Sequence, residues 1–244
     1  MTRQQILAEL KSGDARFDVV IVGGGITGAG AAREAAGSGL RTLLVEQKDF
    51  AWGTSSRSSK MVHGGLRYLG SGHIGLARDA VRERQRIMEE APGLVDPLRF
   101  VMPHFRGQFP GPRLFQALLS VYDRLAGVSS RQRLTPSQSQ QWAPGLSQAG
   151  LLGASLFTDA LTDDARLVQR LIAEASRDGA LCLNYVSANR ITRDEAGRVN
   201  GVVLVPEGEP LQAGISVSAN TVINATGAWA DKLQQQGPSE QPLS

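Results

Sequence analysis

The stretch Phe17–Gly30, FDVVIVGGGITGAG, decides the fold. Its first part, Phe17–Val22, is a short apolar run that ends in glycines, which is typical of a buried parallel strand. Small residues follow and predict a helix that ends at Gly37 or Gly39. The run Arg41–Glu46, RTLLVE, predicts a second strand. Strand, glycine turn, helix and strand follow one another within about thirty residues, the size of one βαβ unit. We therefore expect an α/β fold with a Rossmann-like domain.

The glycines of this stretch have the spacing G-x-G-x-x-G, with Gly23, Gly25 and Gly28 at the three positions. The first allows a tight turn, the second lets the backbone approach a pyrophosphate, and the third permits close packing of helix and strand. The pattern alone is weak, but here it follows a predicted strand and opens a predicted helix. Glu46 ends the second strand, where a carboxylate can accept hydrogen bonds from a ribose diol. This favours a ribose without a 2′-phosphate and leaves NAD and FAD both open.

The loop Gln47–Leu69 follows directly and contains the string TSSRSSKMVHGGLRYL. Its hydroxyl groups can hydrogen-bond phosphate and ribityl oxygens, and they belong to Thr54, Ser55, Ser56, Ser58 and Ser59. Gly64 and Gly65 leave bare backbone that suits the close approach of a flat ring. His63 and Arg67 are four residues apart and would face one site if this segment is helical or turned. Composition alone favours a solvated surface loop, because loops are normally polar.

The overall composition excludes several classes of protein. The net charge of +3, from 26 Lys and Arg against 23 Asp and Glu, is too mild to indicate nucleic-acid binding. Cys182 is the only cysteine, which excludes an internal disulfide and a cysteine-built metal cluster. His73 and His104 stand alone, so no metal site is expected. No apolar run has the length of a membrane-spanning helix, and we expect a cytoplasmic protein.

Three later segments have ordinary structural explanations. The run TDDARLVQRLIAEASRDG predicts a helix with Thr162 as N-cap and Gly179 as its end, so the carboxylates of its first turn are explained by capping. The segment Ser129–Ser147 is rich in Gln and Ser and is expected to be a surface connection. Apolar residues line one face of the helix expected around Leu114–Leu125. That stripe is typical of a core, and docking on a membrane surface stays open as an alternative.

The block VIVGGGITGAG…LLVEQKDFAWGTSSRSSKMVHGGLRYL strongly resembles the FAD-dependent glycerol-3-phosphate dehydrogenases. These belong to the flavoprotein superfamily that includes D-amino-acid and glycine oxidases. The string TSSRSSKMVHGGLRYL is specific to that family within the superfamily. The segments LFTDALTDDARLV, GALCLNYVSA and NATGAWAD resemble it too, so the resemblance covers most of the chain, from about Phe17 to Asp231.

The resemblance implies FAD as the cofactor and assigns its contacts. The residues implied for the ADP half are Gly23, Gly25, Gly28 and Glu46. Those implied for the pyrophosphate and the isoalloxazine are Thr54, Ser55, Ser56, Ser59, Gly64, Gly65 and Leu66. The backbone of Ala188 falls where family members touch adenine, and Thr226 and Gly227 form a second glycine turn near the diphosphate. His63 and Arg67 match a His and an Arg on the substrate side.

The implied reaction is oxidation of sn-glycerol 3-phosphate to dihydroxyacetone phosphate. An imidazole suits the base that takes the hydroxyl proton, so we assign that role to His63. Arg67 would hold the developing oxyanion or the substrate phosphate. The family passes its electrons to a membrane quinone, with a soluble oxidase as a variant, and peripheral attachment to the cytoplasmic membrane face stays open. Two other hypotheses stay open: an amine or amino-acid oxidase of the same superfamily, and an inactive nucleotide-binding remnant.

The expected organisation has three parts. Residues 1–16 are a short polar leader, 17–231 are the FAD-binding oxidoreductase domain with an inserted or following β-rich substrate region, and 232–244 are a polar tail. Family chains continue well past NATGAWAD, so the resemblance implies that the domain is incomplete at its C-terminus. We expect the 244-residue chain to be a fragment with uncertain activity of its own.

Overall fold

The computed structural model describes residues 1–13, 15–211 and 214–234. The chain divides into two compact units. Unit 1 consists of Met1–Ser58 together with Asp164–Ser244, and unit 2 consists of Ser59–Asp163. Unit 2, the β-rich region that we expected as an inserted or following part, is therefore an insertion in the chain of unit 1, and the range 17–231 includes all of unit 2 and most of unit 1.

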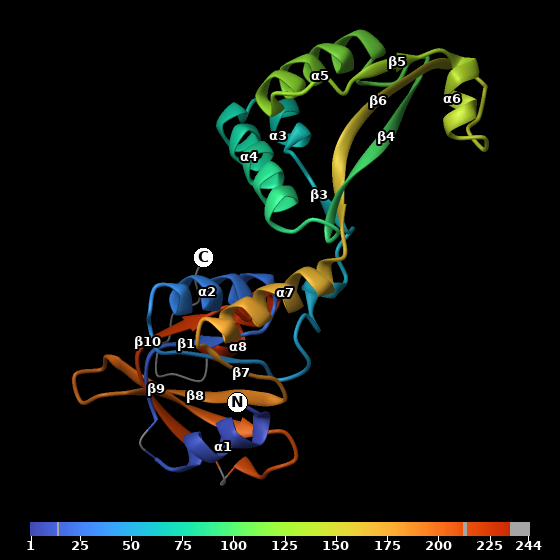
Figure 1. The fold of residues 1–244 in the computed structure, drawn as a ribbon. Helices are drawn as coiled ribbons and strands as arrows, with labels where there is room; N and C mark the ends of the chain where they lie inside the picture. Colours follow the sequence, from blue (N-terminus) through green and yellow to red (C-terminus); the bar gives the residue numbers. More distant parts are fainter. Residues whose placement is uncertain (14, 212–213, 235–244) are drawn as a thin grey trace. The chain divides into compact units, whose positions relative to one another are not determined.

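Unit 1 is built on a six-stranded sheet with the order β7-β2-β1-β10-β9-β8 (Figure 1). Its strands are β1 (Arg16–Val22), β2 (Thr42–Val45), β7 (Leu181–Leu183), β8 (Val186–Arg193), β9 (Val199–Pro206) and β10 (Ile215–Asn224). Strands β7, β2, β1 and β10 pair in parallel, while β9 and β8 continue the sheet in antiparallel pairing. The predicted βαβ unit is confirmed, with β1 at the centre of the sheet.

Helices cover both faces of this sheet. They are α1 (Arg3–Lys11), α2 (Ile26–Gly37), α7 (Asp164–Arg177) and the short α8 (Ala230–Gln234). Alanines of α2 pack against Val168 and Ile172 of α7 on one face, where Figure 1 shows the two helices side by side. On the other face, Ile6 and Leu10 of α1 are buried in a second core. Most of the predicted leader is thus a helix that belongs to the core of unit 1. Of the predicted tail, 232–244, the residues from 235 onward lie outside the described part of the chain.

Unit 2 contains a second sheet in which β6 (Leu151–Thr162) pairs with β3 (Met61–Val62), β4 (Val95–Phe105) and β5 (Gln132–Leu134). The long strands β4 and β6 run antiparallel over most of their length. The helices are α3 (Leu66–Gly70), α4 (Ile74–Glu90), α5 (Pro112–Ala126) and α6 (Pro136–Trp142). A small core of Leu69, Ala77, Val81 and Tyr122 joins α3, α4 and α5.

Two local predictions were wrong. The segment Ser129–Ser147 is not merely a connection, because it contains β5 and α6, and Thr135 begins α6 with a capping box. Thr162 is not the N-cap of α7. It is the last residue of β6, and its Oγ1 donates a hydrogen bond to the backbone oxygen of Leu94. The end of α7 is as predicted, with Gly179 at a φ of +100° just beyond it.

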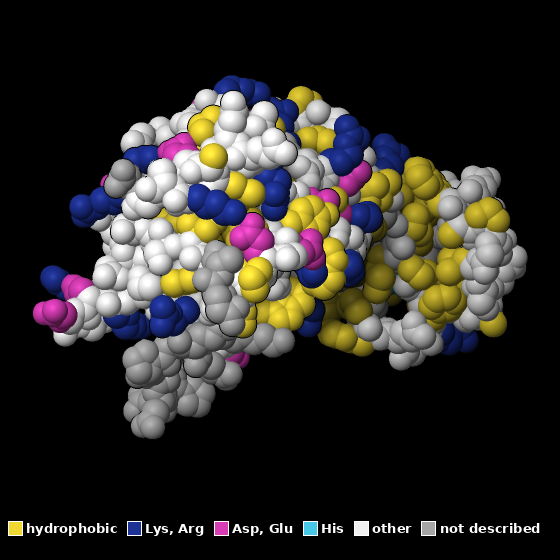
Figure 2. Space-filling view, turned by 90° about the horizontal axis from the view of Figure 1, so that it is seen from below, with side chains coloured by type: hydrophobic (Ala, Val, Ile, Leu, Met, Phe, Trp, Pro, Cys, Tyr) yellow, Lys and Arg dark blue, Asp and Glu magenta, His cyan; other side chains and the backbone are white. Residues whose placement is uncertain are grey.

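The surface of the described residues carries charges of both signs. On the face shown in Figure 2, basic and acidic side chains are interspersed. Of the α5 stripe, Phe115, Leu119 and Tyr122 are buried, whereas Leu114 and Val121 remain exposed. Within the part of the chain that the structure describes, no helix is both long and apolar enough to span a bilayer.

Candidate functional site

The glycine turn after β1 can be built only with glycine at its key positions. A Cβ on Gly28 would lie 1.8 Å from the backbone oxygen of Gly23. Gly23 itself has a φ of +115°, and a Cβ there would lie 2.4 Å from the backbone oxygen of Ala225. Gly25 is the N-cap of α2 and provides no side-chain hydrogen bond. The first turn of α2 therefore presents backbone N–H groups and its positive dipole end without a cap from the side chain of its own N-cap residue, which is the arrangement that binds phosphate groups.

This turn opens onto a pocket of about 570 Å³ in unit 1, a volume typical of ligand sites. The pocket lies at the carboxyl ends of β1, β2 and β10, and Val186 and Ala188 of β8 also line it. Its lining includes Gly23, Gly25, Thr27, Glu46, Lys48, Trp52, Thr54, Ser55, Ala188, Thr226, Gly227, Trp229 and Leu233. Because ligands of open α/β sheets bind at the carboxyl ends of parallel strands, this is the expected place for a cofactor.

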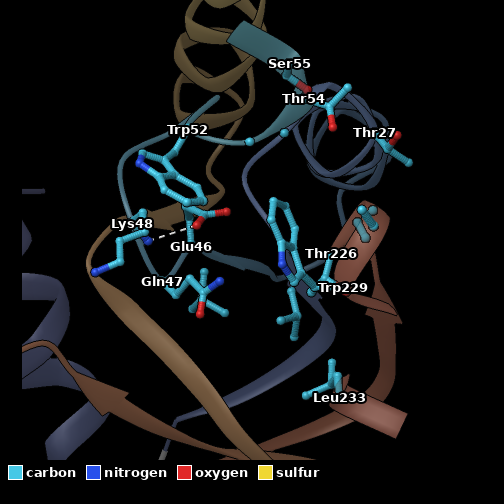
Figure 3. A pocket seen from close by; sticks show the side chains of 18 of the residues that line it. Thr27, Glu46, Gln47, Lys48, Trp52, Thr54, Ser55, Thr226, Trp229 and Leu233 are labelled. Carbon is cyan, nitrogen blue, oxygen red and sulfur yellow. Dashed lines mark hydrogen bonds between the residues drawn. The ribbon is translucent and has the colours of Figure 1, made fainter. Parts of the chain in front are cut away.

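Glu46 is fixed in this pocket by two backbone groups. Its Oε2 accepts a hydrogen bond of 2.7 Å from the Gly24 N–H, and its Oε1 accepts one of 2.8 Å from the Lys48 N–H. The second of these is the dashed line in Figure 3. Each carboxylate oxygen has further lone-pair capacity. The carboxylate is thus held in place and can still accept from a ribose diol.

Hydroxyl groups gather at the helix end of the pocket. Ser55 lies in a 3₁₀ turn, Thr54–Ser56, and its Oγ accepts a hydrogen bond of 2.9 Å from the N–H of Ile26, the first residue of α2. Figure 3 shows Thr27, Thr54 and Ser55 close together at that end, with Leu233 far from them. The Ser55 hydroxyl oxygen thus already accepts from the Ile26 N–H, which is a backbone donor that a phosphate oxygen would use.

Two tryptophans border the same pocket, and the sequence analysis gave them no place in it. The rings of Trp52 and Trp229 lie 6.0 Å apart, centroid to centroid, at an interplanar angle of 41°. The guanidinium of Arg57 lies over the Trp52 ring at 4.9 Å. A Cβ on Gly53 would lie 3.1 Å from the Trp229 ring, so the indole packs on bare backbone. The signal available in the sequence was their position, each within a few residues of a glycine in a turn.

Half of the sixteen predicted site residues line this pocket. They are Gly23, Gly25, Glu46, Thr54, Ser55, Ala188, Thr226 and Gly227. Gly28 packs against the Gly23 backbone of the turn, and Ser56 lies in the same 3₁₀ turn as Ser55. The remaining six belong to unit 2, and they are Ser59, His63, Gly64, Gly65, Leu66 and Arg67.

In unit 2, His63 and Gly64 follow the short strand β3, and Arg67 lies in α3. His63 and Arg67 are both exposed, whereas Gly64 is buried. Behind Gly64 lies a cluster that the sequence analysis did not identify, formed by Arg84 of α4, Tyr122 of α5 and Asp159 of β6. All three side chains are buried. Burial, and after it the Asp159 carboxylate, raises the pKa of Tyr122 well above its usual range, so its hydroxyl stays protonated.

The residues of the unit 1 pocket fit a bound dinucleotide. The turn admits no Cβ at Gly23 or Gly28, the N-cap residue of α2 is a glycine without a side chain, and a fixed carboxylate stands at the end of β2. A sheet whose central strands are parallel, together with these three features, defines the class of α/β proteins that bind a dinucleotide at the first βα turn. Comparison with known families narrows the class. The chain belongs to the FAD dependent oxidoreductase family (DAO), whose model matches residues 18–243, and its cofactor is FAD.

Curated relatives point to one branch of that family. The chain is 39% identical over 237 residues to an aerobic glycerol-3-phosphate dehydrogenase of Staphylococcus saprophyticus, covering 96% of this chain and 42% of the relative. It is 40% identical over 253 residues to an alpha-glycerophosphate oxidase of Streptococcus pyogenes, covering 99% of this chain and 40% of the relative. The chain thus spans about 40% of the length of these relatives.

Solved structures agree on the fold. The glycerol-3-phosphate dehydrogenase of Bacillus halodurans, solved with FAD, matches with a TM-score of 0.73 at 32% identity, over 96% of this chain and 38% of its own. The L-proline dehydrogenase of P. horikoshii matches with a TM-score of 0.69 at 18% identity, over 91% of this chain and 56% of its own. The second likeness concerns the fold alone.

Proposed function

We propose that this chain belongs to an enzyme that oxidises sn-glycerol 3-phosphate to dihydroxyacetone phosphate with bound FAD. The observation that carries the proposal is the identity of 39–40% to glycerol-3-phosphate dehydrogenases and oxidases over nearly the whole chain. The pocket of unit 1 supports it, because its glycine turn and Glu46 suit the ADP half of FAD. Relatives with amino-acid substrates share the fold at low identity only, which gives the amine-oxidase hypothesis no comparable support.

We propose the cofactor contacts from the chemistry of the pocket together with the family resemblance. The N–H groups at the start of α2 and the hydroxyls of Thr54 and Ser55 would hold the diphosphate. Glu46 would accept from the adenosine ribose, and the backbone of Ala188 would contact the adenine. Thr226 would approach the diphosphate from the end of β10. The resemblance assigns the remaining flavin contacts to Ser56, Ser59, Gly64, Gly65 and Leu66.

The reaction removes a hydride and a proton from a secondary alcohol. When bound, FAD supplies the two-electron acceptor for the hydride. His63 would take the hydroxyl proton, because an imidazole is a base near neutral pH and this side chain is exposed, with 60% of its surface accessible. Arg67 would bind the substrate phosphate or the reacting oxygen with its planar fork of donors.

The test is to purify the protein with FAD and follow bleaching of the flavin without oxygen after adding glycerol 3-phosphate. We expect rapid bleaching by glycerol 3-phosphate and none by glycerol, glycine or D-alanine. Bleaching by an amino acid and not by glycerol 3-phosphate would replace the proposal with the amine-oxidase hypothesis. Release of NAD and no flavin on denaturation would refute the proposal. If the protein bound FAD but none of the tested substrates bleached it, the chain would be an inactive remnant.

The electron acceptor is a separate part of the proposal. We propose a quinone, and hence peripheral contact with a membrane, because the first relative above is called a dehydrogenase. The streptococcal relative is called an oxidase, so oxygen is the alternative. Reduction of a short-chain quinone should outpace hydrogen peroxide formation in air-saturated buffer. The opposite ranking would assign the acceptor role to oxygen.

A further inference from the structure

We propose that Asp159 is a positioning residue for His63: it holds the imidazole with Nδ1 protonated and leaves Nε2 as the proton acceptor. The proposal rests on the proposed function, since it takes His63 as the base. Asp159 lies in the middle of the unit 2 cluster, on β6, and only 4% of its side chain is exposed. A buried carboxylate is costly unless each of its oxygens is well used.

One oxygen of Asp159 is fully engaged. Its Oδ1 accepts hydrogen bonds from Arg84 Nη1 at 2.7 Å, from the Gly64 N–H at 2.9 Å and from the Tyr122 hydroxyl at 3.3 Å. Arg84 Nη1 also donates to the Tyr122 oxygen at 2.5 Å. Three elements far apart in sequence therefore fix the carboxylate, and its plane cannot turn freely. A carboxylate fixed in this way can orient a neighbour.

The backbone beside His63 is pressed against this cluster. A Cβ on Gly64 would lie 1.8 Å from the Tyr122 hydroxyl oxygen and 2.7 Å from Arg84 Nη1. Gly64 therefore allows its own N–H to reach Asp159. Because His63 precedes Gly64 directly, the same contact places the backbone of His63 at a fixed distance from the carboxylate.

The second oxygen faces the imidazole. Asp159 Oδ2 lies 3.8 Å from His63 Nδ1. This is longer than a hydrogen bond, but such contacts are often long before substrate binds and shorten in the reacting complex. With Nδ1–H directed at Asp159, the lone pair of Nε2 is free for the substrate hydroxyl. The arrangement is the base–orienter pair that enzymes use to select a histidine tautomer.

The charge of Asp159 is shared with Arg84, whose guanidinium is also buried. The charged and titratable groups of the cluster around Asp159 are thus Arg84 and the protonated Tyr122, besides His63 itself. The guanidinium offsets much of the carboxylate's field at the imidazole. Selection of the tautomer is therefore the main effect of Asp159, and the Asp159→Asn variant isolates it. Its amide oxygen can still accept from Gly64 and Arg84, while its NH₂ group would donate to Nδ1 and force the proton onto Nε2.

The tautomer can be measured directly. The sequence contains only three histidines, so ¹⁵N-histidine labelling and long-range ¹H–¹⁵N correlation resolve the ring of His63, identified by its loss in His63→Ala. We expect mainly the Nδ1–H form in the unsubstituted protein above pH 8 and the Nε2–H form in Asp159→Asn. Asp123→Asn is the matched control, because Asp123 is equally buried in unit 2 but bonds Ser130 and Arg131. An Nε2–H form in the unsubstituted protein overturns the proposal, whether or not Asp159→Asn folds.

A double-mutant cycle tests whether Asp159 acts through His63. Anaerobic flavin reduction by glycerol 3-phosphate should slow by roughly 10²–10⁴-fold in Asp159→Asn. In the His63→Ala background the same substitution should slow it by less than about 3-fold. An equal loss in both backgrounds means a structural role only and overturns the proposal. If His63→Ala alone leaves the rate unchanged, the base assignment of the proposed function fails as well. If flavin reduction is slow in His63→Ala but unchanged in Asp159→Asn, the positioning role of Asp159 is refuted and the base assignment of His63 stands.

Discussion

Replacing Gly28 by alanine tests whether the glycine turn has the geometry of a phosphate cradle. The matched control is Gly30→Ala, two residues further along α2. A Cβ on Gly30 has no atom within 4 Å outside the local helix backbone, whereas a Cβ on Gly28 would lie 1.8 Å from the Gly23 oxygen and 3.3 Å from Ala225 Cβ. The two substitutions change helix propensity equally and differ in what the new methyl group meets.

The magnitudes follow from these contacts. Glycine to alanine inside a helix stabilises by about 0.5–1 kcal/mol, so Gly30→Ala should raise Tm by about 1–4 °C. At Gly28 the Gly23 carbonyl must retreat by about 1 Å in a close-packed interior. It cannot do so freely, because the Gly23 N–H bonds the Val45 oxygen at 2.8 Å. Overpacking of this kind costs on the order of 3 kcal/mol, or roughly 6–12 °C in Tm.

The assay is thermal unfolding followed by circular dichroism, with and without added FAD, together with titration of flavin fluorescence. Gly28→Ala should melt below the parent and should lose most of the stabilisation that FAD provides, because the displaced carbonyl lies in the turn. Gly30→Ala should keep both. If Gly28→Ala had the same Tm and the same affinity for FAD as Gly30→Ala, the turn would have space for a Cβ at position 28. The phosphate-cradle argument would then be wrong.

Three further predictions concern single side chains. Glu46→Ala removes a charge-assisted acceptor worth about 1.5–3 kcal/mol, so the Kd for FAD, measured by fluorescence titration, should rise roughly 10–150-fold; an unchanged Kd would remove Glu46 from the site. Burial raises the pKa of the Cys182 thiol, so a thiol reagent at pH 8 should react slowly with the folded protein and rapidly in denaturant; equal rates would contradict its burial. Burial lowers the pKa of His104 below 6.5, so the unfolded chain binds its proton first, and the free energy of unfolding should fall as pH drops below about 6.5. His104→Gln should weaken that dependence of the urea midpoint on pH, and an identical slope would contradict the assignment.

The features that the sequence predicted well are those whose contacts are local. The first βα turn depends on residues that follow one another, since Gly23 and Gly28 touch each other directly. Glu46 lies at the end of the next strand, and both of its backbone partners, Gly24 and Lys48, belong to the same βαβ unit. Hydrophobic periodicity and glycine spacing therefore sufficed to place Gly23, Gly25 and Glu46 in the pocket, whereas Ala188, Thr226 and Gly227 were assigned through the family resemblance.

The predictions that failed depended on tertiary partners. The segment Ser129–Ser147 is polar in composition, but β5 within it is held by pairing with Ala154–Leu156 of β6. Thr162 has the chemistry of an N-cap, but β6 extends through it and the Leu94 oxygen takes its hydroxyl. Residue type indicates what a side chain can do locally, and pairing with distant strands decides which option is used.

The two glycines after His63 show the same limit at the candidate site. Their pattern suggested close approach to a flat ring, and the structure gives Gly64 a second reason to be glycine, because its missing Cβ leaves space for Tyr122 and Arg84. The partners of that contact are separated by 38 residues from Arg84 to Tyr122 and by 95 from Gly64 to Asp159. No local pattern joins residues at such distances. A chain that kept His63 and both glycines but lost the Asp159 acceptor would leave the Gly64 N–H and the Arg84 guanidinium buried without it, at a cost of several kcal/mol. The motif can therefore specify its loop only together with the buried cluster behind it.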